Sequence, residues 1–257
     1  MSEKLDYKQI AEVYSQKPKY EQELDLNHVN FHRLLIETVE WKIPNLMLVV
    51  PPGFHPKTVA EIGCFNGHLI GNLIINGKKD FKKFGFDVSQ KAINSAKILY
   101  PNVDFYCQDI FESGQFFDLL ILSDIVEHIE DDLDFLKKCA SISNNVLLNI
   151  PIEKALINIK RKYGFGDPSG HLRWYSIADS KKLISLSGFT IIRSSIACLL
   201  EDKVFDKIMD LKLLFKQQDI LDLRKKKAAL FLFRSNRWLL RKYFGFNFFA
   251  FLTCRPN

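Results

Sequence analysis

Apolar residues along the chain occur either in short continuous runs or at helical spacing. The continuous runs predict seven strands, over residues 58–62, 81–86, 103–107, 117–122, 145–150, 189–197 and 246–254. Stretches with helical spacing lie between them and predict helices over 67–75, 90–99, 131–141 and 177–186. Strands that alternate with helices are typical of a parallel α/β sheet covered on both faces.

The segments before and after this alternation differ from it. A polar leader over 1–20 precedes an apolar-periodic stretch over 27–39, for which Asn27 or Asn30 can act as the helix cap, and Pro44 and the 51–53 turn should break the chain. We therefore expect one domain of 257 residues with four parts. They are a helical cap over 1–52, a ligand-binding core over 57–198, a basic helical insert over 199–244 and a last strand over 245–257.

The first predicted strand ends in a glycine turn. Glu61 is followed by Gly63 and Gly67, and the helical pattern resumes directly afterwards. A strand, a tight turn and a helix amino terminus form a nucleotide site, and a glycine there lets a ligand approach the backbone. The spacing is not the G-x-G-x-x-G of dinucleotide sites. A carboxylate this close to the turn suits a ligand with a sulfonium or ammonium charge better than a pyrophosphate.

Two more acids follow predicted strands. Asp87 ends the second strand, where a carboxylate can accept both hydroxyls of a ribose; it can also simply cap the helix over 90–99. Asp109 follows the third strand and is either a ligand contact or a surface turn. The fourth run is nearly continuous, as a strand covered on both faces should be, and it leads into the polar segment 123–128.

Together, the E-x-G-x-x-x-G turn over 61–67, Asp87, Asp109 and the segment 123–128 resemble the class I S-adenosylmethionine-dependent methyltransferases. The resemblance covers about residues 26–198 and the last strand. It implies a doubly wound seven-stranded Rossmann-like sheet whose last strand is antiparallel at the edge, and S-adenosylmethionine as cofactor. The cofactor contacts it implies are Arg33, Glu61, Gly63, Cys64, Gly67, Asp87, Val88, Asp109, Ile110, Ser123 and Asp124.

Two stretches also resemble the ubiquinone-biosynthesis O-methyltransferases within that class. The stretch 27–33 implies that Arg33 holds the cofactor carboxylate, although Arg33 can also be a solvent-facing residue of an amphipathic helix. The segment 123–128 implies that Ser123 lies beside the methionyl part of the cofactor and that Asp124 faces the methyl group. His128 is then either a general base or a residue that pins the following helix by hydrogen bonding.

A second histidine follows a glycine-rich segment over 163–170, which is typical of a mobile active-site loop. The stretch 171–176 resembles one found in sugar-modifying methyltransferases. It makes His171 a candidate base or hydroxyl contact, the alternative being a hydrogen bond to a backbone carbonyl. Arg173 pairs either with an acidic substrate group or with a surface carboxylate.

The cysteines argue against a metal centre and against an extracellular setting. The five are scattered, lack C-x-x-C spacing and lie mostly in apolar runs, which predicts buried, reduced thiols. We expect no metal site. No apolar run is long enough to span a bilayer and no signal peptide is evident, so we expect a cytoplasmic protein.

The net charge of +6 is concentrated in one segment. Residues 224–242 hold eight basic side chains and no acid, interleaved with apolar residues, so the remainder carries −2. Such a segment suits peripheral contact with an anionic membrane, RNA phosphates, or a helical lid that is basic only on its wet face.

These patterns favour methyl transfer from S-adenosylmethionine to an oxygen or nitrogen of a small molecule, such as a sugar or a lipid-linked saccharide. An N-P-P-Y-type signature is absent after the fourth strand, which argues against a nucleic-acid base as acceptor. Two alternatives stay open. One is an RNA or protein methyltransferase that docks through the basic insert, and the other is a non-catalytic scaffold, because a fold alone does not determine a function.

Overall fold

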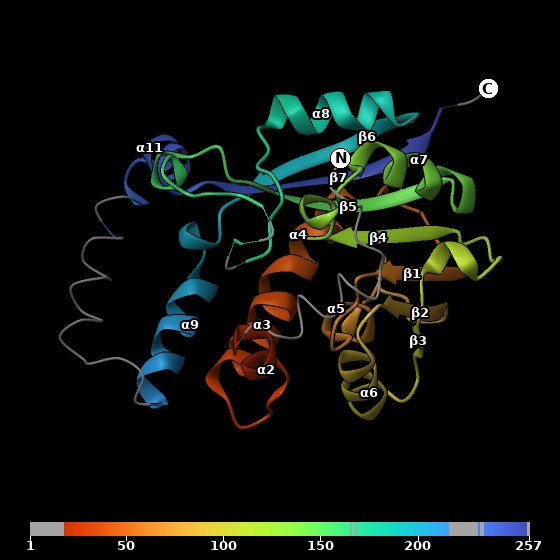
Figure 1. Cartoon of the computed structure of the whole chain (residues 1–257), viewed down its shortest axis with the longest axis horizontal. Helices are drawn as coiled ribbons and strands as arrows, with labels where there is room; N and C mark the ends of the chain where they lie inside the picture. The colour runs from red at the N-terminus through yellow and green to blue at the C-terminus, as the bar shows by residue number, and fades with distance from the viewer. Residues whose placement is uncertain (1–17, 165, 168, 216–230, 232–233, 256–257) are drawn as a thin grey trace.

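The computed structural model describes residues 18–164, 166–167, 169–215, 231 and 234–255. Its centre is a seven-stranded sheet in the order β3-β2-β1-β4-β5-β7-β6 (Figure 1). The strands are β1 Thr58–Ile62, β2 Lys82–Asp87, β3 Asp104–Cys107, β4 Leu119–Ser123, β5 Asn145–Ile152, β6 Phe189–Ala197 and β7 Phe246–Cys254. Strands β1 to β5 are parallel, and β7 is antiparallel to both its neighbours. This confirms the predicted doubly wound α/β sheet.

The last strand does not lie at the edge of the sheet, where we expected it. Strand β7 is inserted between β5 and β6, so β6 forms that edge. Burial explains the order. The central residues of β7, Phe248 to Leu252, are all buried, whereas β6 exposes the side chains of Thr190, Arg193 and Ser194. A strand that is apolar on both faces is stable only inside the sheet, and a polar strand tolerates its edge.

Helices cover both faces of the sheet. They are α2 Pro18–Leu24, α3 Val29–Glu37, a π-helical segment Thr38–Lys42, α4 Ile43–Val49, α5 His68–Asn72, α6 Gln90–Leu99, α7 Asp132–Ile142, α8 Ile177–Leu186, α9 Lys203–Leu214 and α11 Arg237–Phe244. One core cluster joins α4, α5, α6 and α9 to one face, and a second joins α7 and α8 to the other. Adjacent residues such as Val59 and Ala60 of β1 enter opposite clusters, as the period of a strand requires.

Three local expectations about the amino-terminal half are wrong. The cap of α3 is His28, whose Nδ1 accepts from the backbone N–H of Asn30 at 3.1 Å. The helix expected over 67–75 ends at Asn72, because the chain then extends to bury Leu73 and Ile75 in the core. Pro44 does not break the chain, because it lies in the first turn of α4, where its missing N–H is tolerated.

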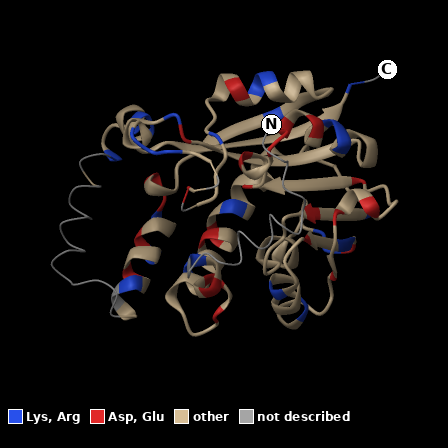
Figure 2. Cartoon of the chain, in the orientation of Figure 1, with Lys and Arg blue, Asp and Glu red and all other residues tan. Residues whose placement is uncertain are grey.

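The described part of the insert packs on the core through Val204 and Ile208 and is held together by its own charge pairs. Arg234 pairs with Asp206 at 2.9 Å, and Arg241 makes a bidentate pair with Glu201 at 2.6 and 2.8 Å. Figure 2 shows both signs of charge on α9. Lys225 to Lys227 lie outside the described residues. Among the residues that are described, no helix has the length and apolarity needed to cross a membrane.

All five cysteines are free thiols, as expected. Cys64, Cys139 and Cys198 are buried and Cys254 is half-buried. Cys107 is exposed, which overturns the expectation of a buried thiol at that position, because it ends β3 at the edge of the sheet.

Candidate functional site

A cavity of about 820 Å³ opens at the carboxyl ends of β1, β2 and β4. Its volume is that of a ligand pocket, and ligands of open parallel sheets bind at this edge. Helices α2 and α3 contribute Tyr20, Glu23 and Arg33 to its wall. The predicted site residues that line it are Arg33, Glu61, Gly63, Cys64, Asp87, Val88, Asp109, Ile110, Ser123, Asp124, His128 and His171.

Gly67 belongs to the turn but does not line the cavity. Both turn glycines have positive φ, +69° at Gly63 and +78° at Gly67. A Cβ on Gly67 would lie 2.6 Å from Cζ of Phe105, and one on Gly63 would lie 2.7 Å from Cδ1 of Ile125. The missing side chain of Gly67 therefore makes room for an aromatic ring of β3. Ligand approach at Gly67, which we expected, stays a prediction.

Glu61 is buried in the floor of the cavity and anchors the helix that follows the turn. Its Oε2 accepts from the backbone N–H of Ile70 at 3.0 Å, which satisfies a first-turn N–H that Gly67, as the cap residue without a side chain, leaves open. Burial raises the pKa of this carboxyl to about 8. The side chain therefore has a structural partner in addition to facing the cavity.

Asp87 connects two turns at the tips of the strands. Its Oδ2 accepts from the backbone N–H of Phe65 at 2.8 Å, and its Oδ1 accepts from Ser89 at 2.9 Å. The cap of α6 is Ser89, so capping does not account for Asp87. Burial raises the pKa of the Asp87 carboxyl. The Tyr20 hydroxyl donates to Ser89, which holds α2 over this part of the cavity.

Asp109 and Ile110 form the wall beyond β3. Oδ1 of Asp109 accepts from the backbone N–H of Phe111 at 3.0 Å and so caps the short 3₁₀ turn Ile110–Glu112. Ile110 is buried against the core. Asp109 thus has an ordered local role and still lines the cavity, which is more than a free surface turn would do.

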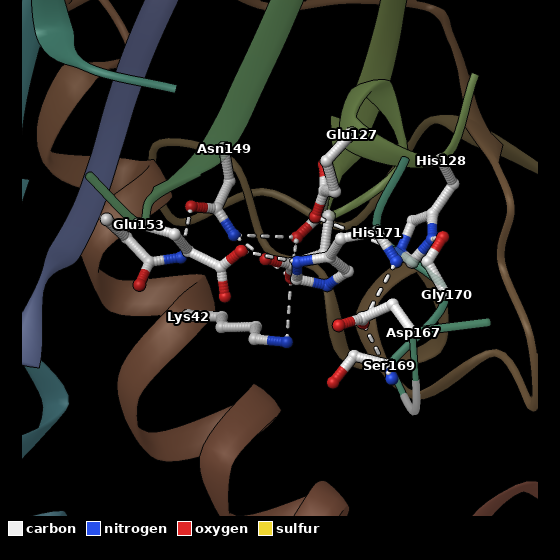
Figure 3. Close-up of polar contacts among 12 residues, drawn as sticks. Lys42, Glu127, His128, Asn149, Glu153, Asp167, Ser169, Gly170 and His171 are labelled. Atoms are coloured by element: carbon white, nitrogen blue, oxygen red, sulfur yellow. Dashed lines mark hydrogen bonds and ion pairs between the residues drawn. The ribbon is translucent and has the colours of Figure 1, made fainter. Parts of the chain in front are cut away.

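Lys42, which we did not predict, lies beside Asp124. Lys42 Nζ is 2.8 Å from Asp124 Oδ2, and Asn149 and Ser123 each donate to the same oxygen at 3.1 Å (Figure 3). Burial favours the neutral carboxyl, but Lys42 outweighs it and lowers the pKa of Asp124. Asp124 has φ +54°, a strained value for a residue with a side chain. The sequence carried no signal for a partner 82 residues away.

Arg33 lies in the cavity wall and is not solvent-facing. Its Nη2 is 2.6 Å from Glu23 Oε1, and its Nη1 is 2.8 Å from Glu37 Oε2. The guanidinium is therefore already paired with two carboxylates. A ligand carboxylate can reach it only by displacing or joining one of these acids.

His128 and His171 meet at the other end of the cavity. Their ring centroids are 4.8 Å apart with the planes at 84°. Nδ1 of His128 donates to the Gly170 carbonyl at 3.0 Å, and Nδ1 of His171 is 2.6 Å from Glu153 Oε2 (Figure 3). Nδ1 of His128 therefore holds the glycine-rich loop, where we had expected a general base or a bond to the following helix. For His171 we considered a substrate contact or a hydrogen bond to a backbone carbonyl. The protein partner that it has is the carboxylate of Glu153.

Glu127 completes this group and was also missed. Its side chain is 1% exposed, and neither carboxylate oxygen makes a hydrogen bond with any other described residue. Nε2 of His128 lies 3.9 Å from Oε1. Burial raises the pKa of this carboxyl well above its ordinary value. The sequence did offer one signal for a role of Glu127, because this residue directly precedes His128 in the segment 123–128.

The described residues of the glycine-rich loop are anchored by an arginine. Arg161 contacts Asp167 through Nε and Nη2, both at 2.6 Å, and reaches Glu153 through Nη1 at 2.7 Å. Asp167 accepts from the backbone N–H groups of Ser169 and His171.

Arg173 lies outside this network and pairs with Asp132 at 2.7 Å. The partner is therefore a carboxylate of the protein, but a half-buried one, where we had considered a surface carboxylate or an acidic substrate group.

Comparisons with known proteins agree with this geometry. Residues 36–194 match the family described as Methyltransferase domain. A curated viral protein, Putative methyltransferase 235L of Invertebrate iridescent virus 6, is 48% identical over 54 residues, which are 21% of this chain and 20% of that protein. The match thus spans only about a fifth of that relative.

Two solved structures show the same fold. Cyclopropane synthase MmaA2 from Mycobacterium tuberculosis has a TM-score of 0.60 at 15% identity, covering 96% of this chain and 98% of the other. Magnesium protoporphyrin IX methyltransferase from Synechocystis, with bound SAH, has a TM-score of 0.55 at 17% identity, covering 97% and 100%. The sheet, the cavity at its carboxyl edge and the family match over more than half of the residues agree: the chain belongs to the methyltransferase domain family and has its Rossmann-like fold.

Proposed function

We propose that the protein transfers a methyl group from S-adenosylmethionine to an oxygen or nitrogen of a small molecule. One observation carries the proposal. A single cavity runs from the acids at the tips of β2 and β3, Asp87 and Asp109, to the paired histidines His128 and His171. Its first part suits an adenosine, and its far part offers side chains that can act on a polar acceptor.

The cofactor is assigned along the cavity wall. Asp87 accepts the ribose hydroxyls, while Asp109 accepts from the adenine amino group and Ile110 packs on the ring. Ser123 and Asp124 lie beside the methionine portion, where the Lys42–Asp124 pair sets the local charge.

Arg33 is assigned to the cofactor carboxylate. Because it is already paired, we expect that carboxylate to compete with Glu23 or Glu37 for the guanidinium.

The reaction needs alignment more than it needs bond activation. The acceptor oxygen or nitrogen attacks the methyl carbon, the carbon–sulfur bond breaks, and its electron pair stays on sulfur in S-adenosylhomocysteine. Holding nucleophile, carbon and sulfur in line supplies most of the acceleration, because the sulfonium is already a good leaving group. The acceptor also loses a proton, and we place that loss beside His128 and His171.

We favour a saccharide acceptor, free or lipid-linked. The stretch 171–176 supports it through its resemblance to sugar-modifying methyltransferases. The insert supports a membrane-bound acceptor, because Trp238 and Phe231 are 67% and 76% exposed and Lys242 Nζ lies 4.7 Å from the centroid of the Trp238 ring. Apolar side chains among basic ones suit peripheral contact with an anionic lipid surface.

Calorimetric titration of S-adenosylmethionine tests the cofactor assignment. We expect binding to the wild type, weaker by about 10- to 100-fold in Asp87→Asn, because an amide cannot replace a charged acceptor worth about 1.5–3 kcal/mol. Asp104→Asn, an exposed acid at the other end of the neighbouring strand, is the matched control and should bind like the wild type. Equal affinity of all three proteins contradicts the assignment.

Acceptors are then screened by the S-adenosylhomocysteine they release, with nucleotide sugars and lipid-linked saccharides first. Sedimentation with anionic vesicles at low salt, against neutral vesicles, tests the membrane contact. Absence of any difference between the two vesicle types removes that part of the proposal.

A further inference from the structure

Glu127 is the least explained side chain of the site. It is fully buried, and its two oxygens make no hydrogen bond with any other described residue. An unpaired buried carboxylate costs several kcal/mol, so buried charges are normally paired or bound to metals. The carboxylate points toward the two histidines in Figure 3. Such a group needs a partner that the described residues do not supply.

The two imidazoles are held in the orientation that ligands need. The hydrogen bonds of His128 to the Gly170 carbonyl and of His171 to Glu153 both engage Nδ1. Nε2 is the other nitrogen of each ring, and that of His128 lies 3.9 Å from Oε1 of Glu127. Metal-binding histidines are held in the same way, with the second ring nitrogen on a carbonyl or carboxylate.

The spacing is close to that of a coordination sphere. One ligand atom each from Glu127, His128 and His171 lie within 4.8 Å of one another. Ligands about 2.0–2.2 Å from an ion are roughly 3.0–3.5 Å apart, so a closure of about 1.3–1.8 Å brings the most widely separated atoms to bonding distance. The segment that carries His171 is a loop and can make this adjustment more easily than a strand.

We propose that Glu127, His128 and His171 bind a divalent transition-metal cation of the Zn²⁺ or Mn²⁺ type, contrary to our expectation from the cysteines. Two imidazoles and one carboxylate favour these ions over Mg²⁺ and Ca²⁺, which prefer oxygen ligands. Glu153 and Gly170 form the outer shell that orients the rings. Three protein ligands leave further positions open toward the cavity.

The role of the cation in catalysis rests on the proposed function, whereas its binding does not. A cation at this end of the cavity holds an acceptor through oxygen and lowers the pKa of the bound hydroxyl, whose proton passes to solvent water. Two neighbouring hydroxyls of a sugar can bind together. The inference therefore narrows the acceptor to an oxygen nucleophile, with a vicinal diol as the preferred group.

Metal binding is measured on the full-length protein after treatment with a chelator. Titration with Co²⁺, followed by its visible absorption and by calorimetry, should give one ion per chain in the wild type. Glu127→Gln should weaken binding by at least about 100-fold, and Glu153→Gln by about 10- to 100-fold. Glu127 lies in the one-turn 3₁₀ helix Val126–His128. Glu112→Gln, which changes an exposed acid in the 3₁₀ turn Ile110–Glu112, is therefore the matched control and should bind like the wild type.

Two results overturn the inference: no stoichiometric ion in the wild type, or equal affinity of the wild type and Glu127→Gln. His171→Gln provides a second variant if Glu127→Gln does not fold, which its thermal unfolding reports. S-adenosylmethionine binding by the chelated protein is measured in parallel. If that binding persists without metal binding, the metal site is wrong and the proposed function stands; if only the metal binds, the cofactor assignment is wrong.

Discussion

The turn that precedes α5 allows a test of why Gly67 is a glycine. In Gly67→Ala the new methyl group would lie 2.6 Å from Cζ of Phe105 and 3.2 Å from Cδ2 of Tyr100, at a φ of +78°. Neither ring moves easily. Phe105 is buried in β3, and the Tyr100 hydroxyl contacts Nδ1 of His68 at 2.8 Å and accepts from Asn72 at 2.9 Å.

Two separate terms add in this variant. A left-handed backbone costs a residue with a Cβ about 1–2 kcal/mol, and overpacking a core costs about 1–3 kcal/mol. We therefore expect Gly67→Ala to lower the free energy of unfolding by about 2–5 kcal/mol.

The chain offers a control for each term. Gly53 has φ +80° and open space around it, so Gly53→Ala should cost about 1–2 kcal/mol. Gly71 is helical without a positive φ, but its Cβ would lie 2.3 Å from Tyr100. Gly71→Ala therefore tests the clash alone. The higher helix propensity of alanine offsets about 1 kcal/mol of the cost of that clash.

Urea denaturation of the three variants measures these terms. A Gly67→Ala cost equal to that of Gly53→Ala would refute the packing argument, because it would leave no contribution from Phe105. The cofactor titration adds an independent check. Since Gly67 does not line the cavity, S-adenosylmethionine affinity of folded Gly67→Ala should stay close to that of the wild type. A large loss of affinity in a folded variant would instead support ligand approach at this glycine.

Three further predictions follow from other buried contacts. Burial lowers the pKa of His68 to about 4, while the unfolded chain takes up this proton near pH 6.5, so the free energy of unfolding should fall by about 3 kcal/mol between pH 6.5 and pH 4. His68→Gln should flatten that dependence in urea titrations at several pH values, and an unchanged slope would assign it to other groups. Asp118 Oδ2 accepts from the backbone N–H groups of Lys57 and Thr58, so Asp118→Ala should lower the free energy of unfolding by about 1–3 kcal/mol. Asp118→Asn keeps an acceptor oxygen and should lose less in the same thermal denaturation. Arg241→Met should cost about 1.5–3 kcal/mol by removing the pair with Glu201, and a neutral result in thermal denaturation would show that α11 is held by its apolar face alone.

Most of the elements were predictable because their signals are local. The helices over 90–99 and 177–186 and the strands over 189–197 and 246–254 have the predicted bounds, since each is set by its own periodicity and by a neighbouring cap or turn. The residues that line the cavity were predictable for a related reason. The carboxyl ends of parallel strands meet at one edge, so Asp87, Asp109 and Ser123 could be placed together without knowing any contact.

Local patterns along the chain therefore suffice for most of the elements, the family resemblance and the side of the sheet where the site lies. The folded structure was needed to place β7 inside the sheet, because that position depends on comparing the burial of two strands. It also decided the pairs Lys42–Asp124 and Glu153–His171, whose partners come from separate segments. Period and spacing describe one segment at a time, whereas a charge pair or a buried unpaired carboxylate such as Glu127 exists only after distant segments have packed together.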